Sequence, residues 1–248
     1  MKQYFHAFVM CQSMFCAIPF PCTVWDEDAR DKMLLFLPVI GLEIGLIWAG
    51  TAYLAAFLQL SQLITAFILC ALPYTATGFI HLDGFMDVTD AIKSCRDPEK
   101  RRAILKDPHV GSFAVIGCVL LMLAQYALFA AVSEGWRVLI FLPVVTRCCS
   151  AYAITVLPPM ATSQYARQGG NKSHKYTFLL MLYAAVALGF VFAGIHAIAL
   201  LFGALGSALS IRKGVKSLGG MNGDISGYAL TIGELWGIAA LSVLGGIV

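Results

Sequence analysis

About seven stretches of this chain are long and apolar enough to cross a lipid bilayer as α-helices. A membrane-spanning helix needs about 20 mostly apolar residues, within a range of roughly 17–25. The two short segments that meet near Gly194–His196 form either one tight hairpin or two full crossings. Gly41 and Gly45 in the first segment are expected to let helices approach closely. The segments are residues 34–58, 61–80, 112–132, 138–158, 177–194, 196–211 and 227–248.

The scarcity of charge supports a membrane protein. Of the 248 residues, 59% are hydrophobic and only 12% are charged, whereas a typical soluble domain has roughly 25% charged residues. A soluble fold cannot bury this much apolar surface, because single cores stop growing at about 250–300 residues. The composition excludes a soluble globular domain, a disordered chain and a nucleic-acid-binding protein built on basic density. We predict an all-α, polytopic integral membrane helical bundle that forms one domain over residues 1–248.

The N-terminal segment and the cysteines have structural interpretations. His6, Gln12 and Ser13 interrupt the first apolar run, which argues against a cleaved signal peptide. Residues 3–17 are instead expected to form a short helix that lies in the membrane interface or is tucked against the bundle. The eight cysteines show no CxxC or other metal-binding spacing, so we expect reduced, structural thiols.

Positive charge falls almost entirely in the loops of one side. When loops are placed alternately on the two sides, all but two of the 17 Lys and Arg residues share one side, the exceptions being Arg137 and the intramembrane Arg147. The positive-inside rule puts that side, with the N-terminus, in the cytoplasm. We therefore expect a multi-pass protein of the inner (cytoplasmic) membrane. The loops on that side are residues 1–33, 81–111, 159–176 and 212–226.

The polar loop after the second segment carries three aspartates in helical register. Asp83, Asp87 and Asp90 stand at i, i+4 and i+7, within about 60° of one another around a helix. Their repulsion is costly without a cation, and Mg²⁺ is typically held by one or two carboxylates with phosphates and water. A single aspartate here would be an ordinary solvated charge, but three on one face favour a metal site. Gly84 is expected to let a substrate approach the backbone, and His81 points off the aspartate face, either as a structural histidine or as a general base.

A candidate phosphate site follows in the same loop. Asp97 and the next proline predict the start of a short helix, and a second Asp-Pro pair ends it. Gly111 and Ser112 then open the third apolar segment. A helix N-terminus beside Lys106 and His109 is suited to bind phosphate.

Three further charged residues interrupt apolar sequence near the middle and end of the chain. Arg147 lies in the fourth segment and Glu234 in the last, and charges inside a bilayer are by default functional or paired. Asp224, in a glycine-rich turn, is either the cap of the last helix or a site residue. For Glu43 three roles stay open: a coupling carboxylate, a partner of Arg147 or a headgroup-level residue.

Together these residues resemble the cobalamin synthase family, the adenosylcobinamide-GDP ribazoletransferases. The resemblance extends over nearly the whole chain in order and spacing. Cys16-Ala17-Ile18-Pro19 departs from the family's frequent Thr-Arg-Leu-Pro, and Asn222 stands where a hydroxyl residue is common. The motifs are His81-Leu82-Asp83-Gly84 with Asp87 and Asp90, Lys106-Asp107, Val110-Gly111-Ser112-Phe113, Arg147, Tyr165-Ala166-Arg167, Gly219-Gly220, Gly223-Asp224, Gly227 and Glu234.

The resemblance implies a late step in the assembly of the cobalamin nucleotide loop. α-Ribazole, or its 5′-phosphate, attacks adenosylcobinamide-GDP and GMP leaves. For that reaction we expect Asp83, Asp87 and His81 to be catalytic and Mg²⁺ to be bound by Asp83, Asp87 and Asp90. The expected substrate-binding residues are Lys106, Gly111, Ser112, Arg147, Arg167, Asp224 and Glu234.

Two other functions are compatible with parts of the pattern. A CDP-alcohol phosphotransferase also binds metal with membrane aspartates, but its signature places Ala-Arg two residues after Asp-Gly, where this chain has Asp87 and Val88. An ion-coupled transporter would use Glu43, Arg147 and Glu234 as coupling residues. It should also show inverted repeats, and none is evident in the sequence.

Overall fold

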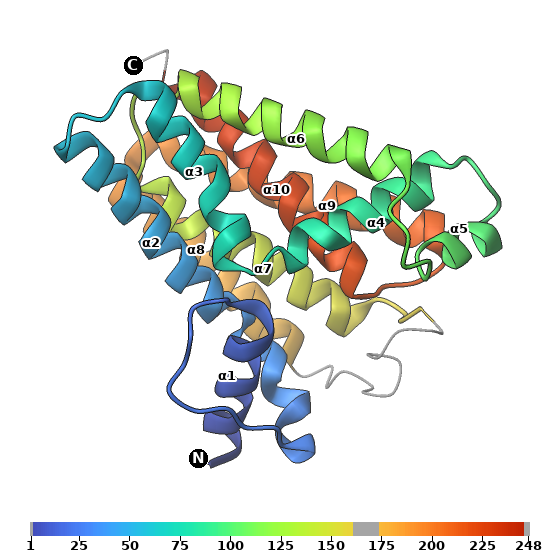
Figure 1. Ribbon diagram of the computed structural model, residues 1–248. Helices are drawn as coiled ribbons and strands as arrows, with labels where there is room; N and C mark the ends of the chain where they lie inside the picture. Colours follow the sequence, from blue (N-terminus) through green and yellow to red (C-terminus); the bar gives the residue numbers. More distant parts are fainter. Residues whose placement is uncertain (1, 161–173, 246–248) are drawn as a thin grey trace.

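A computed structural model describes residues 2–160 and 174–245, and these fold into a bundle of helices (Figure 1). In these two ranges there is no β-strand, only an isolated bridge between Pro159 and Met221. The eight cysteines are free, as expected. The elements are α1 (Lys2–Phe15), η1 (Glu27–Phe36), α2 (Leu37–Phe57), α3 (Gln62–Ala76), α4 (Ile80–Lys93), α5 (Pro98–Ile104), α6 (Ser112–Ala131), α7 (Val138–Val156), α8 (Lys175–Ala193), η4 (Gly194–Ala197), α9 (Ile198–Leu218) and α10 (Gly223–Leu244).

The predicted helical membrane bundle is confirmed, but the count of seven spans is not. Within the described residues, five helical stretches are long and apolar enough to cross a membrane, or six if α3 and α4 form one broken span. The difference arises at two places. The segment predicted over 61–80 yields only the 15-residue α3. The stretch Lys175–Leu218 counts once, although η4 divides it into α8 and α9.

A sharp bend between α3 and α4 corrects the prediction of a loop after residue 80. The two helices meet at 91°, because Gly78 and Phe79 adopt left-handed conformations with φ of 59° and 64°, which end an α-helix. Residues 80–93 then form α4, whose Leu82, Phe85 and Val88 are buried against α6 and α10. The bend therefore places the aspartates on a packed helix rather than in a loop, with Asp87 and Asp90 half-buried and Asp83 exposed.

Helix α7 forms the centre of the bundle and contacts α2, α8, α9 and α10. The approach of α2 to α7 depends on glycine, as expected from the sequence. A Cβ atom at Gly41 would lie 2.7 Å from the carbonyl oxygen of Pro143, and one at Gly45 would collide with the backbone of Ile140. Larger residues at these positions would separate the two helices.

The N-terminal helix is tucked against the bundle, which was one of the two predicted placements. Ala7, Met10 and Cys11 of α1 are buried in a cluster with residues of η1, α2 and α7. His6 on α1 lies 2.6 Å from Asp26, just before η1, between Nδ1 and Oδ2. These contacts hold α1 beneath the start of α2, at the lower end of the view in Figure 1.

Candidate functional site

Helix α4 presents its three aspartates to the segment that joins α5 to α6. Asp83, Asp87 and Asp90 line a cavity of about 20 Å³. That volume is close to the space that one water molecule occupies, so it suits an ion and is far too small for a nucleotide. The opposite wall is formed by Ile104, His109, Val110 and Gly111.

A close approach of α4 and α10 adds a fourth carboxylate to this group. A Cβ atom on Gly84 would lie 2.9 Å from the carbonyl oxygen of Asp224, and one on Gly227 would lie 2.8 Å from that of His81. Gly84 therefore contacts α10, and the expectation that a substrate approaches its backbone is wrong. The contact brings Asp224 close enough to interact electrostatically with Asp83 and Asp87. Asp83, Asp87, Asp90 and Asp224 are called the carboxylate cluster below.

The carboxylate cluster has no cationic partner in the part of the chain that the structure describes. In residues 2–160 and 174–245, none of its four members lies within 4.0 Å of a Lys, Arg or His nitrogen. Nor do three His, Cys, Asp or Glu side chains of this part converge closely enough to hold a metal ion alone. Neighbouring carboxylates disfavour one another's charge, so the cluster is suited to bind a cation. It would supply one or two oxygens and leave the remaining positions to phosphate and water, as Mg²⁺ prefers.

Asn222 positions Asp224, and sequence reasoning did not assign it a role. Its Oδ1 accepts from the backbone N–H of Ile225 at 2.9 Å and so caps α10, while its Nδ2 donates to Asp224 Oδ2 at 2.6 Å. The cap of the last helix is therefore Asn222, and Asp224 stands in the first turn. An asparagine directly before an apolar helical run is a recognisable N-cap signal, but its second hydrogen bond is visible only in three dimensions.

We expect replacement of Asn222 to separate the capping of α10 from the orientation of Asp224. Asn222→Gly removes the donor to Asp224, but glycine is tolerated at a helix N-cap at a cost of only about a few tenths of a kcal/mol, so its thermal stability should stay close to that of the wild type. Its activity should fall about 10–100-fold, a typical loss for a group that orients a metal-site ligand. Asn222→Ala should lose both activity and about 1 kcal/mol of stability. Turnover and thermal unfolding of the two variants check this, and equal activity in Asn222→Gly and wild type would contradict it.

The N-terminus of α6 is occupied differently from the prediction. The carboxylate of Asp90 lies directly against Gly111, where a Cβ atom would collide with both of its oxygens. An acidic side chain is favourable at this position because of the helix dipole. Ser112 and Lys106 are exposed, so they remain accessible to a phosphate group. A phosphate that bound at this helix end would meet Asp90, which requires a cation between them or a shift of Asp90.

The loop before α6 is held by a local pair. Asp107 Oδ1 accepts from the backbone N–H of His109 at 3.0 Å and lies 2.7 Å from its ring Nδ1. These bonds hold the pKa of Asp107 below its ordinary value. The pair fixes His109 on the rim of the cavity that the aspartates line.

His81 lies away from this cavity. Its ring is buried and stacks on Phe15 of α1, with 6.1 Å between ring centroids and 5° between planes. Its carbonyl oxygen accepts from Thr231 Oγ1 at 3.4 Å. The structure therefore places His81 between the N-terminal helix and α10 rather than beside the carboxylate cluster.

Arg147 and Glu234, both predicted to bind substrate, bind each other in the core. Arg147 Nη1 lies 3.0 Å from Glu234 Oε1, and their side chains are 1% and 6% exposed. Arg147 also donates to the carbonyl oxygen of Pro143 at 3.2 Å.

Glu43 does not pair with Arg147. It accepts from Gln12 Nε2 at 3.2 Å, so among its proposed roles that of partner to Arg147 does not match the geometry. Arg167, another predicted substrate-binding residue, and the Tyr165-Ala166-Arg167 motif lie outside the described residues.

Comparisons with known proteins cover almost the whole chain. A family model described as cobalamin-5-phosphate synthase matches residues 7–242. The chain is 38% identical over 252 residues to an adenosylcobinamide-GDP ribazoletransferase of Clostridium perfringens (strain SM101 / Type A), covering 98% of this chain and 100% of that protein. Proteins of the same name from Clostridium botulinum (strain Alaska E43 / Type E3) and Geotalea daltonii are each 34% identical, over 96% and 92% of this chain and 97% and 93% of theirs. No solved structure matches the chain significantly.

Proposed function

The chain belongs to the cobalamin-5-phosphate synthase family, and we propose that it is an adenosylcobinamide-GDP ribazoletransferase whose carboxylate cluster is the reaction centre. We assign the reaction on one observation: the chain is similar, over nearly their full length, to relatives that bear this name. The chain is an enzyme of cobalamin biosynthesis, and this function is favoured over a CDP-alcohol phosphotransferase and over an ion-coupled transporter. Its small-molecule partners are the cobinamide-GDP and ribazole-type substrates.

The proposed reaction is a substitution at phosphorus. A hydroxyl oxygen of α-ribazole, or of its 5′-phosphate, forms a bond to the cobinamide-side phosphorus of adenosylcobinamide-GDP. The bond from this phosphorus to the bridging oxygen breaks, and GMP departs with that oxygen. The proton of the attacking hydroxyl passes to a base. Such transfers depend mainly on positioning and on neutralising charge.

The carboxylate cluster has the chemistry to hold Mg²⁺ for this reaction. We propose Asp83 and Asp87 as ligands; Asp90, whose carboxylate lies against Gly111, would join them only after a shift. When bound, the ion neutralises charge on the two phosphates and on the departing GMP. The support is the all-oxygen donor set and the absence of a cationic side chain beside it in the described ranges.

The other residues of the site have simpler proposed tasks. Asp224, oriented by Asn222, adds a ligand or positions the ribazole. Lys106 is exposed in the segment between α5 and α6, and we propose that it contacts phosphate oxygens as a substrate arrives. A cluster aspartate is the better candidate for proton acceptor than His81, because His81 is buried against Phe15.

We also propose that the bundle spans the cytoplasmic membrane with this site on the cytoplasmic side. Five or six helical stretches are suited to crossing a bilayer. The C-terminal ends of α7 and α9 and the segments on both sides of α5 lie at one end of the bundle (Figure 1), and they belong to the predicted arginine- and lysine-rich side. The positive-inside rule assigns such an end to the cytoplasm.

One assay tests the reaction and the metal together. Purified protein in detergent is incubated with adenosylcobinamide-GDP and either α-ribazole or α-ribazole 5′-phosphate, and GMP and the corrinoid product are identified by chromatography and mass spectrometry. We expect equimolar GMP and product, loss of both with EDTA, and recovery with added Mg²⁺. Substrate uptake into vesicles without GMP release would instead favour a transporter. Full activity in EDTA would remove the metal from the proposal and leave the transfer reaction intact.

A further inference from the structure

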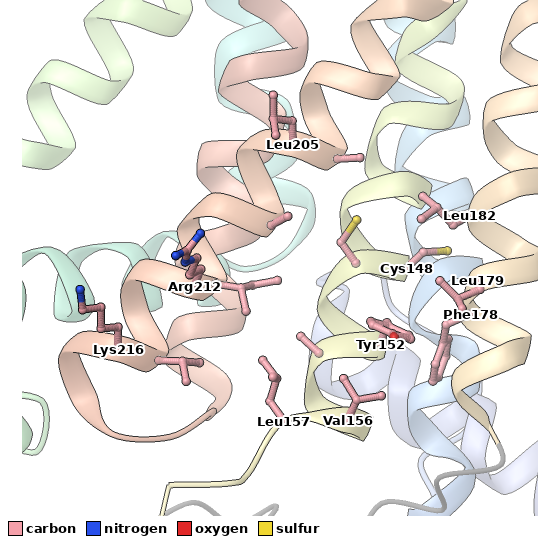
Figure 2. Close-up of a pocket in the computed structure, with 16 residues that line it drawn as sticks. Cys148, Tyr152, Val156, Leu157, Phe178, Leu179, Leu182, Leu205, Arg212 and Lys216 are labelled. Atoms are coloured by element: carbon pink, nitrogen blue, oxygen red, sulfur yellow. The ribbon is translucent and has the colours of Figure 1, made fainter.

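A large groove lies apart from the carboxylate cluster. It has a volume of about 760 Å³ and lies between α7, α8 and α9 (Figure 2). It shares no lining residue with the cavity at the aspartates. α4 packs mainly on α10 and touches α9 only slightly, so the groove and the carboxylate cluster lie on different helices.

The groove exists because α8 and α9 diverge from their common turn. Near η4 they touch, since a Cβ atom at Gly189 would collide with Leu200. Towards the other end they separate, and α7 forms the floor between them. The walls there are apolar, with Tyr152 on α7, Phe178 and Leu182 on α8 and Leu205 on α9 (Figure 2).

One end of the groove carries two positive charges. Arg212 and Lys216 lie one turn apart on α9, and both belong to the lining. Figure 2 shows their nitrogen atoms directed away from the apolar part of the groove. In the described chain, neither has an acidic side chain within 4.0 Å. This is the end that we place at the cytoplasmic border of the membrane, where lipid headgroups lie.

We propose that this groove binds an anionic phospholipid, with an acyl chain between α8 and α9 and the headgroup phosphate on Arg212 and Lys216. The inference rests on the proposed membrane location but not on the proposed reaction. Basic pockets between membrane helices on the cytoplasmic side are suited to anionic lipid headgroups, and long basic side chains extend towards the interface from an apolar stem. A second groove between α6, α9 and α10 is lined by no charged residue, so it offers no preference for headgroup charge.

The test measures lipid binding to the full-length protein in detergent. Phosphatidylglycerol and phosphatidylcholine with identical acyl chains are titrated separately, and bound lipid is counted by native mass spectrometry while the melting temperature is followed. We expect tighter binding of phosphatidylglycerol and a larger rise in melting temperature. Arg212→Gln/Lys216→Gln should weaken phosphatidylglycerol binding about 30-fold and leave GMP release unchanged.

Two further variants separate this site from general effects. Lys213→Gln removes a neighbouring charge that does not line the groove, and it should bind phosphatidylglycerol like the wild type. Ala208→Trp fills the groove without changing charge and should abolish the tight binding, which keeps the test decisive if the double variant fails to fold.

Four results would overturn the proposal. These are equal binding of both lipids by the wild type, an equal loss in Lys213→Gln, displacement of phosphatidylglycerol by GMP or α-ribazole 5′-phosphate, and a dimer that replaces lipid in the groove and is lost in Ala208→Trp. The first two indicate non-specific lipid or charge effects. The third assigns the basic pair to substrate, and the fourth assigns the groove to a second copy of the chain.

Discussion

Asp87→Asn should lower GMP release about 1,000-fold while leaving the protein at least as stable as the wild type. A metal ion contributes several kcal/mol of charge stabilisation to such a transition state, and about 1.4 kcal/mol corresponds to a tenfold change in rate. The substitution also removes one of four neighbouring negative charges, which should not destabilise the metal-free fold. Loss of function with retained or improved stability distinguishes a metal-binding carboxylate from a structural one. Initial rates with Mg²⁺ present check the first part, and melting temperatures in EDTA check the second.

A second measurement addresses the metal directly. Mg²⁺ should raise the melting temperature of the wild type, because a ligand that binds only the folded state stabilises it. It should not do so in Asp83→Asn or Asp87→Asn. Asp97→Asn is the matched control: it removes a carboxylate from the same region, and asparagine still caps α5, where Asp97 now accepts from Lys100 N–H at 3.0 Å. Near-wild-type turnover in Asp87→Asn would eliminate the carboxylate cluster as the reaction centre.

Local features of the sequence predict much of this fold and site. Long apolar stretches predict the helices because burial in a bilayer depends on composition over about 20 residues. The shared face of Asp83, Asp87 and Asp90 follows from the helical period alone, and the structure places all three along one cavity. The start of α5 after Asp97 and of α6 at Ser112 likewise follow from short capping signals.

Features that depend on contacts between distant elements were not predictable in this way. The bend before α4 requires a left-handed Phe79, a conformation that residue type alone does not indicate. Gly84 and Gly227 are required where α4 and α10 touch, because a side chain at either position would collide with the backbone of the other helix. The local sequence does not indicate this contact. Asp224 consequently joins aspartates that are more than a hundred residues away in the chain, a proximity that no local pattern encodes.

The charged residues Arg147 and Glu234 show the same limit of prediction from sequence. Their positions in apolar segments correctly mark them as exceptional, because a charge in such a segment is functional or paired. Sequence cannot choose between these outcomes, since the pair joins α7 to α10 across 87 positions of the chain. The structure supports pairing, and variants of the pair test whether pairing is the whole of its role.

Glu234→Gln should destabilise the protein by about 3–5 kcal/mol, the usual cost of removing one partner from a buried ion pair. Arg147→Met should cost less, because the glutamate left behind can take up a proton, whereas an arginine cannot lose one. This asymmetry follows from burial of both side chains, which are 1% and 6% exposed. Thermal unfolding in detergent, followed for both variants under identical conditions, measures the order. Equal stability of Glu234→Gln and wild type would show that the pair is not holding α7 to α10.

The double variant Arg147→Met/Glu234→Leu then separates structure from catalysis. It removes both charges and replaces them with apolar groups, an exchange that is often neutral or stabilising for buried pairs. Its stability should therefore recover well above that of Glu234→Gln. If the pair only joins the helices, GMP release recovers with stability, because neither residue lines the cavity at the carboxylate cluster. If Arg147 also contacts a substrate phosphate, the double variant folds but stays inactive. Arg147 would then belong to the reaction centre.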